Sequence, residues 1–262
     1  MFKFEDNKCY RMPPHFGGAD YVAAGTRYRD NTVLAFSYLT ERAKLEDYIP
    51  EAFELLRPEV SIGFTQCRGI DWMAGSFYNL VMVSAPVRFT GTRDKVEAPY
   101  VLVIWENKTT PILSGREETG FPKIFADIED LHSFSGNFFT NVSFEGNTFL
   151  RLHFSDAVPL GEQELAKMKT VPMDAIGWRY IPKVGGPGAD LSQPIFFPQE
   201  CEVAKAWTGK GAVEWTELSW LQNPNQQHII KALAGLPILE MTSAMMMEGE
   251  MVLKSPLARV LE

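Results

Sequence analysis

Short segments rich in β-branched and aromatic residues recur along most of this chain, and glycine, asparagine and proline divide them. This pattern is typical of β-strands. The segments lie at 33–39, 60–67, 77–89, 100–105, 137–144, 148–154, 200–207, 212–220 and about 239–253. Helices are predicted at 40–49, at 162–169 and between Asn223 and Gly235. Many strands and few helices predict a mainly β chain that forms an antiparallel sheet system or a closed barrel.

Length and composition indicate a single domain. With 262 residues, 45% of them hydrophobic and 22% charged, the chain has the composition of an ordinary globular protein and can bury a large core. Its longest apolar runs, such as 100–105, are too short to cross a bilayer. Residues 1–30 contain Pro13-Pro14 and Gly17-Gly18 and are predicted to form an irregular N-terminal arm. The remaining residues, 31–262, are then one domain.

Charge and residue usage exclude several classes of protein. The formal net charge is −8, and no run of Lys and Arg suits a phosphate backbone, so a nucleic acid is not expected as a partner. The three cysteines are widely spaced and the four histidines are scattered, so the sequence predicts no disulfide framework, metal site or cofactor. The first six residues lack the basic and apolar segments of a signal peptide, and we expect a cytoplasmic protein.

A lysine ends a stiff turn in the middle of the chain, at 115–123, with the sequence Gly-Arg-Glu-Glu-Thr-Gly-Phe-Pro-Lys. Pro122 fixes its own φ, Gly120 favours a turn, and the residues that follow Lys123 are apolar. A free lysine has a pKa of about 10.4 and is a poor nucleophile at neutral pH, whereas apolar burial disfavours the ammonium form. Lys123 is therefore our candidate for an amine that forms an imine with a keto acid.

The same turn resembles the signature of a known family. Gly115-Arg116-Glu117 and then Phe121-Pro122-Lys123 are similar to the glycine-arginine-glutamate and aromatic-proline-lysine motifs of acetoacetate decarboxylase and its relatives. Segments 48–55, 206–209 and 235–240 are similar to family stretches in the same order, so the resemblance covers roughly residues 30–255. It implies an antiparallel β-barrel with an internal cavity, a homo-oligomer, a small keto acid as substrate, and Lys123 as the Schiff-base lysine, as in acetoacetate decarboxylase.

The basic and aromatic residues around this motif are candidates for binding the substrate. Arg116 is suited to hold a substrate carboxylate by a bidentate pair. The resemblance implies an arginine just before the first long strand, which makes Arg27 or Arg29 a second candidate, and a solvated charge is the alternative for each. Phe121 is expected to contribute to the apolar surroundings of Lys123 and its substrate.

Three glutamates are candidates for moving protons. Glu118 lies five residues before Lys123. Glu248 and Glu250 interrupt a segment rich in methionine, where an acid is costly to bury without a partner or a task. A buried glutamate of this kind can have a raised pKa and act as a general acid or base. The alternative is that Gly249 marks a bulge or turn that carries both acids into solvent.

Two departures from the decarboxylase pattern decide the expected reaction. Ile124 stands where acetoacetate decarboxylases carry a second lysine, and Asp71 is the one acid in 63–88, where the decarboxylases carry two glutamates. We therefore expect proton handling that differs from the decarboxylases, and the resemblance then implies the reaction of family members that act as aldolase-dehydratases on pyruvate and an aldehyde. An acetoacetate decarboxylase is the first alternative, because loss of CO2 from an imine needs only the electron sink. A non-catalytic protein that binds a small apolar acid is the second.

Overall fold

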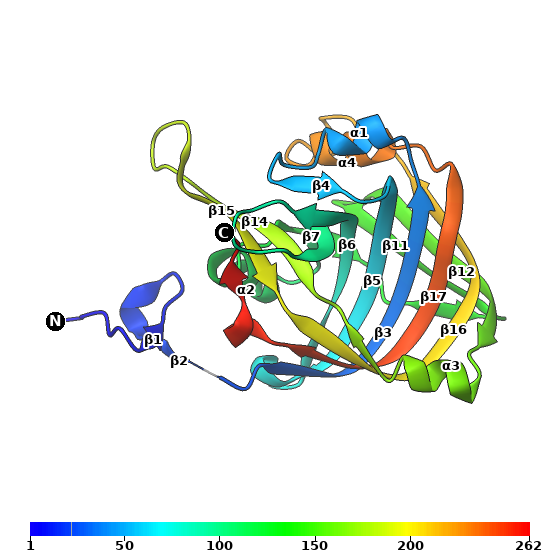
Figure 1. The fold of residues 1–262 in the computed structure, drawn as a ribbon, viewed down its shortest axis with the longest axis horizontal. Helices are drawn as coiled ribbons and strands as arrows, with labels where there is room; N and C mark the ends of the chain where they lie inside the picture. Colours follow the sequence, from blue (N-terminus) through cyan, green and yellow to red (C-terminus); the bar gives the residue numbers. More distant parts are fainter. Residues whose placement is uncertain (22) are drawn as a thin grey trace.

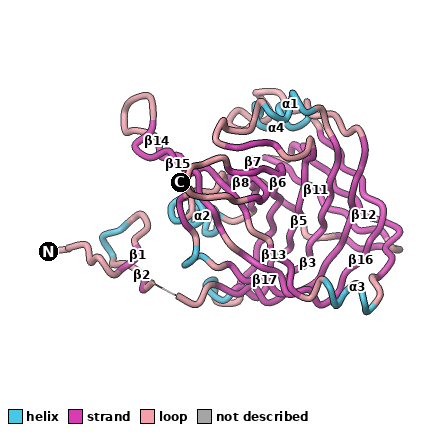
Figure 2. Tube along the Cα trace, viewed as in Figure 1, coloured by secondary structure: helices cyan, strands magenta, loops and turns pink. Residues whose placement is uncertain are grey.

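One large sheet dominates the structure, a computed structural model that describes residues 1–21 and 23–262 (Figures 1 and 2). In this part of the chain, sixteen strands belong to the sheet. Its longer strands are β3 (Thr26–Leu39), β5 (Glu59–Ile70), β6 (Ser76–Phe89), β7 (Glu97–Glu106), β11 (Asn137–Phe144), β12 (Asn147–Pro159), β14 (Ala175–Pro182), β15 (Ala189–Phe197), β16 (Gln199–Trp215) and β17 (Glu240–Leu253). The shorter ones are β4 (Phe53–Leu55), β8 (Lys123–Phe125), β9 (Asp127–Ile128), β10 (His132–Phe134), β13 (Thr170–Pro172) and β18 (Arg259–Val260).

The sheet is mixed, although most of its pairs are antiparallel. The main path runs β10-β11-β12-β16-β17-β3-β5-β6-β7-β14-β15-β18. Strand β7 pairs in parallel with both β8 and β14, which corrects the prediction of an antiparallel sheet system. The mainly β fold itself is confirmed. The path ends at β10 and β18, and as far as residues 1–21 and 23–262 show, no pairing joins these two ends. Barrel closure and an internal cavity therefore remain predictions.

Short helices lie at the margins of the sheet. α1 (Arg42–Glu46), α3 (Glu162–Lys167) and α4 (Gln227–Ala234) fall inside the predicted helical segments. Helix α2 (Thr109–Glu118) is not predicted by the sequence. Residues 115–118, which the sequence predicts as the start of a loop-like turn, form the last helical turn of α2. Single 3-10 turns are η1 (Pro14–Phe16), η2 (Asp71–Met73) and η3 (Ser255–Leu257). None of the helices in the described residues has the length and apolar content to cross a membrane.

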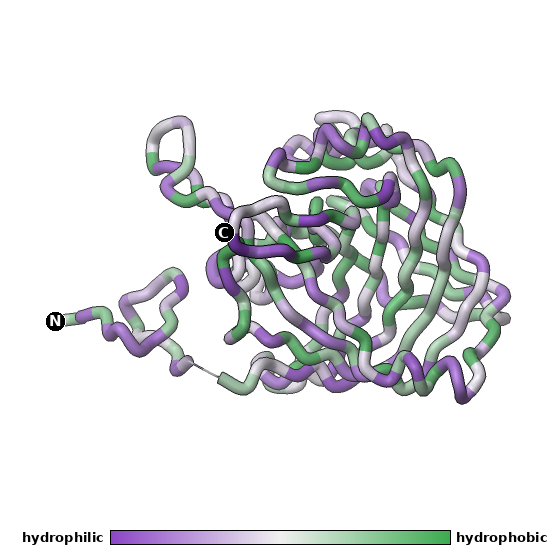
Figure 3. Tube along the Cα trace, in the orientation of Figure 1, coloured by the Kyte–Doolittle hydropathy of each residue, from purple (hydrophilic) through white to green (hydrophobic). Residues whose placement is uncertain are grey.

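Apolar side chains pack on both faces of the central strands. Figure 3 shows that hydrophobic residues recur along these strands. Phe64 of β5 and Val81 of β6 belong to the main core, which also contains Trp105. Because successive side chains of a strand point to opposite faces, Cys67 and Leu80 lie on the other face, in smaller clusters. The site described below is built on this second face.

The N-terminal arm is shorter than the predicted 1–30. Strand β3 begins at Thr26, because Tyr28 and Asp30 already pair with β5, and Thr26 pairs with β17. Before it, β1 (Lys8–Cys9) and β2 (Ala19–Asp20) form a small antiparallel pair that projects from the body in Figure 1. Val22, which the predicted arm includes, lies outside the described residues. The predicted single domain and homo-oligomer remain expectations.

Candidate active site

Lys123 lies next to a buried glutamate. The parallel pairing of β7 with β8 places Ile104 opposite Lys123 and brings the end of β7 beside its side chain. Nζ of Lys123 lies 2.7 Å from Oε1 of Glu106 and 3.4 Å from the carbonyl oxygen of Pro111. The side chain of Lys123 is 15% exposed and that of Glu106 is 0% exposed. The two groups form a charge-assisted hydrogen bond that is shielded from solvent.

Helix α2 packs against the side chain of Lys123 at Gly115, a residue without a side chain. A Cβ at Gly115 would lie 2.4 Å from Cδ and 2.5 Å from Cε of Lys123, far closer than carbon atoms can approach. Gly120 then has φ +69°, a left-handed conformation that glycine adopts without strain. These two glycines allow the chain to leave α2, turn, and enter β8 with Lys123 packed under the helix.

Glu106 has an electrostatic environment that favours its neutral form. Burial raises the pKa of Glu106, and the Lys123 ammonium offsets part of this increase. Its second carboxylate oxygen, Oε2, is buried and has no hydrogen-bond partner within the described residues. A buried acceptor left unpaired costs about 1–3 kcal/mol, so this oxygen favours a proton or a bound ligand. Glu106 is therefore well suited to exchange protons with Lys123.

A buried group of two tyrosines and a thiol lies on the same face. Tyr28, Cys67 and Tyr78 pack together, and Cys67 pairs across strands with Tyr78. Burial, reinforced by the negative charge of Glu106, raises the pKa of the Cys67 thiol to about 12. Burial also raises the pKa of Tyr28 and of Tyr78, and Glu106 adds to both shifts. All three groups are thus protonated at neutral pH and can act as hydrogen-bond donors.

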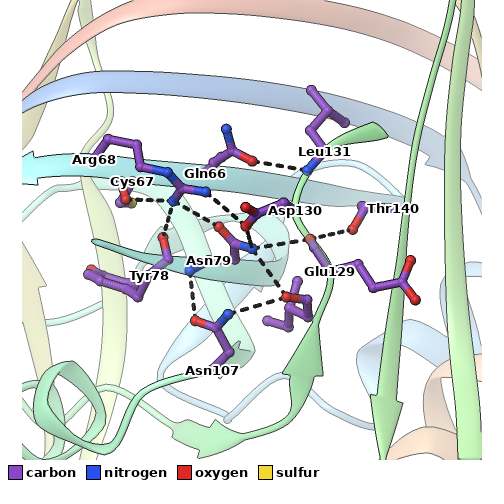
Figure 4. Close-up of polar contacts among 11 residues, drawn as sticks. Gln66, Cys67, Arg68, Tyr78, Asn79, Asn107, Glu129, Asp130, Leu131 and Thr140 are labelled. Atoms are coloured by element: carbon purple, nitrogen blue, oxygen red, sulfur yellow. Dashed lines mark hydrogen bonds and ion pairs between the residues drawn. The ribbon is translucent and has the colours of Figure 1, made fainter. Parts of the chain in front are cut away.

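A network of polar side chains around Asn79 connects residue 107, at the end of β7, with residues 128–130 (Figure 4). Asn79 is fully buried, and its Nδ2 lies within 3.1 Å of the carbonyl oxygens of Ile128 and Glu129 and 2.8 Å from Oδ1 of Asp130. Arg68 donates to Oδ1 of Asn79 at 3.1 Å. Asn107, the residue after Glu106, accepts from the backbone N–H of Asn79 at 2.8 Å. The network thereby ties the end of β7 to the segment that follows β8.

Two of the predicted binding residues lie next to Lys123 in sequence and space. Nη1 of Arg116 donates to the backbone carbonyl of Lys123 at 3.0 Å, and the rest of this side chain is exposed. Phe121 is 6% exposed and packs edge-on against Phe197, with ring centroids 5.5 Å apart. Phe121 is therefore buried two residues before Lys123, and its contact with a substrate stays a prediction.

The other predicted residues take part in ion pairs on exposed surface. Glu118 pairs with Arg11 of the N-terminal arm, and Arg29 holds Asp71 through two hydrogen bonds of 2.7 and 3.0 Å. Glu248 pairs with Lys205 at 2.9 Å and Glu250 with Arg27 at 3.0 Å. Alternation along β17 places both of these glutamates on the face opposite to Met251, which packs against the Tyr28 cluster. The structure does not bring these residues together with Lys123.

Sequence reasoning missed Glu106, although a signal was present. Glu106 directly follows the apolar segment 100–105, and it forms the last residue of β7. An acid that continues an apolar strand is costly to bury unless it has a partner. The same pattern, an acid within an apolar segment, occurs at Glu248 and Glu250 in β17.

Comparison with known proteins supports a family assignment. Residues 11–255 match the family model described as acetoacetate decarboxylase (ADC). The chain is 25% identical over 245 residues to an acetoacetate decarboxylase of Burkholderia ambifaria, covering 91% of this chain and 89% of the relative. It is 24% identical over 254 residues to that of Burkholderia cenocepacia strain J2315, covering 94% and 92%.

Solved structures share the fold. An acetoacetate decarboxylase from Legionella pneumophila superposes with a TM-score of 0.74 at 21% identity, covering 92% of this chain and 89% of its own. The enduracididine biosynthesis enzyme MppR, complexed with pyruvate, gives a TM-score of 0.70 at 14% identity and covers 98% and 99%. An acetoacetate decarboxylase-like enzyme from Sphingomonas wittichii RW1 gives 0.69 at 16% identity and covers 93% and 96%. With a family model matched over nearly its whole length, the chain belongs to the acetoacetate decarboxylase family.

Proposed function

We propose that this protein is a lyase in which Lys123 forms a Schiff base with a small keto acid. The contact of 2.7 Å between Nζ of Lys123 and the buried carboxylate of Glu106 carries the proposal. Membership of the acetoacetate decarboxylase family supports it. A structural neighbour is described as complexed with pyruvate, which is a keto acid of the expected size.

Glu106 supplies the proton transfers that imine formation needs. It takes one proton from Lys123, and its raised pKa makes the carboxylate a better acceptor for that proton. The neutral amine attacks the carbonyl carbon, a second proton passes from nitrogen to oxygen, and Glu106 returns the first proton to that oxygen so that water leaves. The three hydrogens of the ammonium end as one on the protonated imine and two in the water. Glu106 finishes as the carboxylate it was at the start.

We propose aldol condensation followed by dehydration as the net reaction, with pyruvate and an aldehyde as substrates. The imine of pyruvate loses a proton from its methyl carbon, and the resulting enamine attacks the aldehyde carbon. The alkoxide formed in this attack takes up a proton, a second proton leaves the former methyl carbon, and the new hydroxyl group leaves as water with a returned proton. Hydrolysis of the imine then releases the product and restores Lys123. Each of these steps requires a proton acceptor or donor close to the imine, and Glu106 is a buried group of this kind next to Nζ. This supports a reaction with repeated proton transfers.

Decarboxylation of acetoacetate is the second candidate. The curated relatives at 24% and 25% identity carry that name. In this reaction the imine accepts the electron pair of the breaking carbon–carbon bond, CO2 leaves, and the enamine carbon is then protonated. That proton comes from solvent, and Glu106 can pass it on because its raised pKa favours uptake of a proton by the carboxylate.

Reduction with borohydride tests the Schiff base directly. The protein is incubated with pyruvate or with acetoacetate, reduced, and analysed by intact and peptide mass spectrometry. We expect a mass increase on the peptide that contains Lys123, and no increase in Lys123→Met. Lys108→Met is the matched control, because Lys108 contacts Ser76 and Phe77 on the surface and not Glu106. It is expected to trap the keto acid like the unmodified protein.

Two product assays then separate the candidate reactions. Pyruvate with an aromatic or unsaturated aldehyde is expected to give a conjugated product that absorbs in the near ultraviolet. Release of CO2 from acetoacetate without any condensation product would favour the decarboxylase. Absence of an adduct on Lys123 with both keto acids would overturn the proposal and favour a non-catalytic binding protein.

A further inference from the structure

Tyr28 has an unused hydrogen-bond donor in a buried position. Its side chain is 6% exposed, and its hydroxyl oxygen accepts hydrogen bonds from Nε1 of Trp72 at 3.2 Å and from the hydroxyl of Tyr78 at 3.3 Å. Both partners act as donors, so the hydrogen of Tyr28 itself remains available. No acceptor for it is present among residues 1–21 and 23–262. An unused donor at a buried site has a free-energy cost unless a ligand takes the hydrogen bond.

The geometry around Tyr28 makes it a strong and fixed donor. Two hydrogen bonds into the same oxygen draw electron density from it and strengthen the hydrogen bond that its own O–H can donate. Its ring packs edge-on against Tyr78 with centroids 6.2 Å apart, which limits rotation. Burial raises the pKa of Tyr28, so the hydroxyl keeps its hydrogen at neutral and moderately alkaline pH.

This donor faces the same side of the sheet as the unpaired oxygen of Glu106. Register places Glu106 opposite Leu80, and Tyr78 lies two residues before Leu80 on the same face of β6. Tyr28, Cys67 and Tyr78 form one cluster, against which Leu80 also packs. An unused donor and an unused acceptor, Oε2 of Glu106, therefore belong to one buried region beside Lys123.

We propose that Tyr28 is a catalytic residue that donates a hydrogen bond to the carbonyl oxygen of the keto acid while Lys123 attacks the carbonyl carbon. This inference rests on the function proposed above. As the C–N bond forms, the carbon–oxygen π electrons move onto oxygen, and Tyr28 stabilises that developing charge without giving up its proton. Oε2 of Glu106 accepts a hydrogen bond from the carbinolamine hydroxyl, and the Glu106 carboxyl group then returns the proton it took from Lys123 so that water leaves. The two unused groups thus match the two hydrogen-bonding roles of one oxygen atom.

The rate of imine formation tests the proposal. Protein and pyruvate are mixed, quenched with borohydride at successive times, and the adduct on Lys123 is quantified. We expect Tyr28→Phe to slow adduct formation about 100-fold, the effect typical of losing one preorganised donor to a developing oxyanion. Trp72→Phe, which keeps the Tyr28 hydroxyl but removes one donor to it, is expected to slow adduct formation by a smaller factor. Tyr38→Phe is the matched control, because Tyr38 is fully buried in the main core, and it is expected to leave the rate within about two-fold.

The outcomes distinguish this inference from the proposed function. If the unmodified protein forms no adduct with a keto acid, the proposed function fails and this inference fails with it. If the unmodified protein and Tyr28→Phe form the adduct at equal rates, Tyr28 has no catalytic role and the proposed function still holds. If Tyr28→Phe does not fold, Trp72→Phe decides, and an unchanged rate in that variant overturns the proposal.

Discussion

Gly115 and Lys123 are packed so closely that any side chain at residue 115 would occupy the volume of the lysine. A Cβ there would lie 2.4 Å from Cδ and 3.0 Å from Nζ of Lys123. Gly115→Ala is therefore expected to push the lysine away from Glu106 and to lower adduct formation with pyruvate at least about ten-fold, because small misplacements of a reacting group are costly. Borohydride trapping measures this. Gly63→Ala is the control, since a Cβ at Gly63 has no atom within 4 Å, and equal rates in both variants would contradict the prediction.

The identity of the proton-transfer residue can be decided among four glutamates. Glu106→Gln is expected to lower the rate of imine formation about 100-fold to 10,000-fold, the usual range for a general acid or base. Glu118→Gln, Glu248→Gln and Glu250→Gln are expected to retain nearly the full rate, because each of these acids forms an ion pair at partly exposed surface. Time courses of borohydride trapping compare the four variants. Loss of the rate in Glu248→Gln or Glu250→Gln with no loss in Glu106→Gln would reassign the role.

Burial of Glu106 makes the stability of the protein depend on pH in a defined direction. Its pKa in the folded state is raised, so between the unfolded value near 4.5 and the folded value the folded state binds more protons. Stability from this group is present below pH 4.5 and is lost as the pH rises through the folded pKa. Lys123→Met removes the ammonium that offsets the shift, so in that variant the decline is expected to be larger in total and to extend to higher pH. Urea denaturation from pH 4.5 to 8 measures the free energy of unfolding of two proteins, Lys123→Met and the double variant Lys123→Met with Glu106→Gln. Parallel curves of this free energy against pH would show that Glu106 does not titrate in this window.

Asn79 is expected to be important for stability. Asn79→Ala removes an amide that bonds to Ile128, Glu129 and Asp130 and leaves the Arg68 guanidinium without one of its acceptors. A loss of about 2–4 kcal/mol in the free energy of unfolding is expected, because buried polar groups become unpaired. Asn141→Ala is the control, since Asn141 makes an exposed hydrogen bond to Glu129, and its cost is expected to be about 0.5 kcal/mol. Urea denaturation compares the two, and equal costs would contradict a structural role for the network.

The sequence predicts the mainly β type of fold well, but it predicts poorly which strands pair with one another in the sheet. Strand segments were identified because β-branched and aromatic residues are dense between turn residues. The partners of each strand depend on contacts between distant residues, so the parallel pairing of β7 with β8 and β14 has no local signal. Helix α2 was missed for a related reason, because its residues show little separation of apolar and polar faces.

Part of the site was also predictable. Lys123 and Phe121 lie in a distinctive motif, which makes both of them candidates from the sequence alone. Glu106 lies 17 residues earlier, and only the register of β7 and β8 brings it to Nζ. Glu248 and Glu250 looked buried because methionines surround them in sequence, whereas alternation along β17 places them on the opposite face, where Lys205 and Arg27 pair with them.

Pairing of β3 with β17 has a consequence for how this chain folds during synthesis. Leu39 pairs with Glu240, so β3 receives one of its two neighbours only after about 200 further residues have been synthesised. Until then β3 has an unpaired edge, and unpaired edges promote association with other chains. Contacts over such long sequence separations also slow folding. We therefore expect the yield of folded protein to fall when β17 is removed, even though this strand contains neither Lys123 nor Glu106.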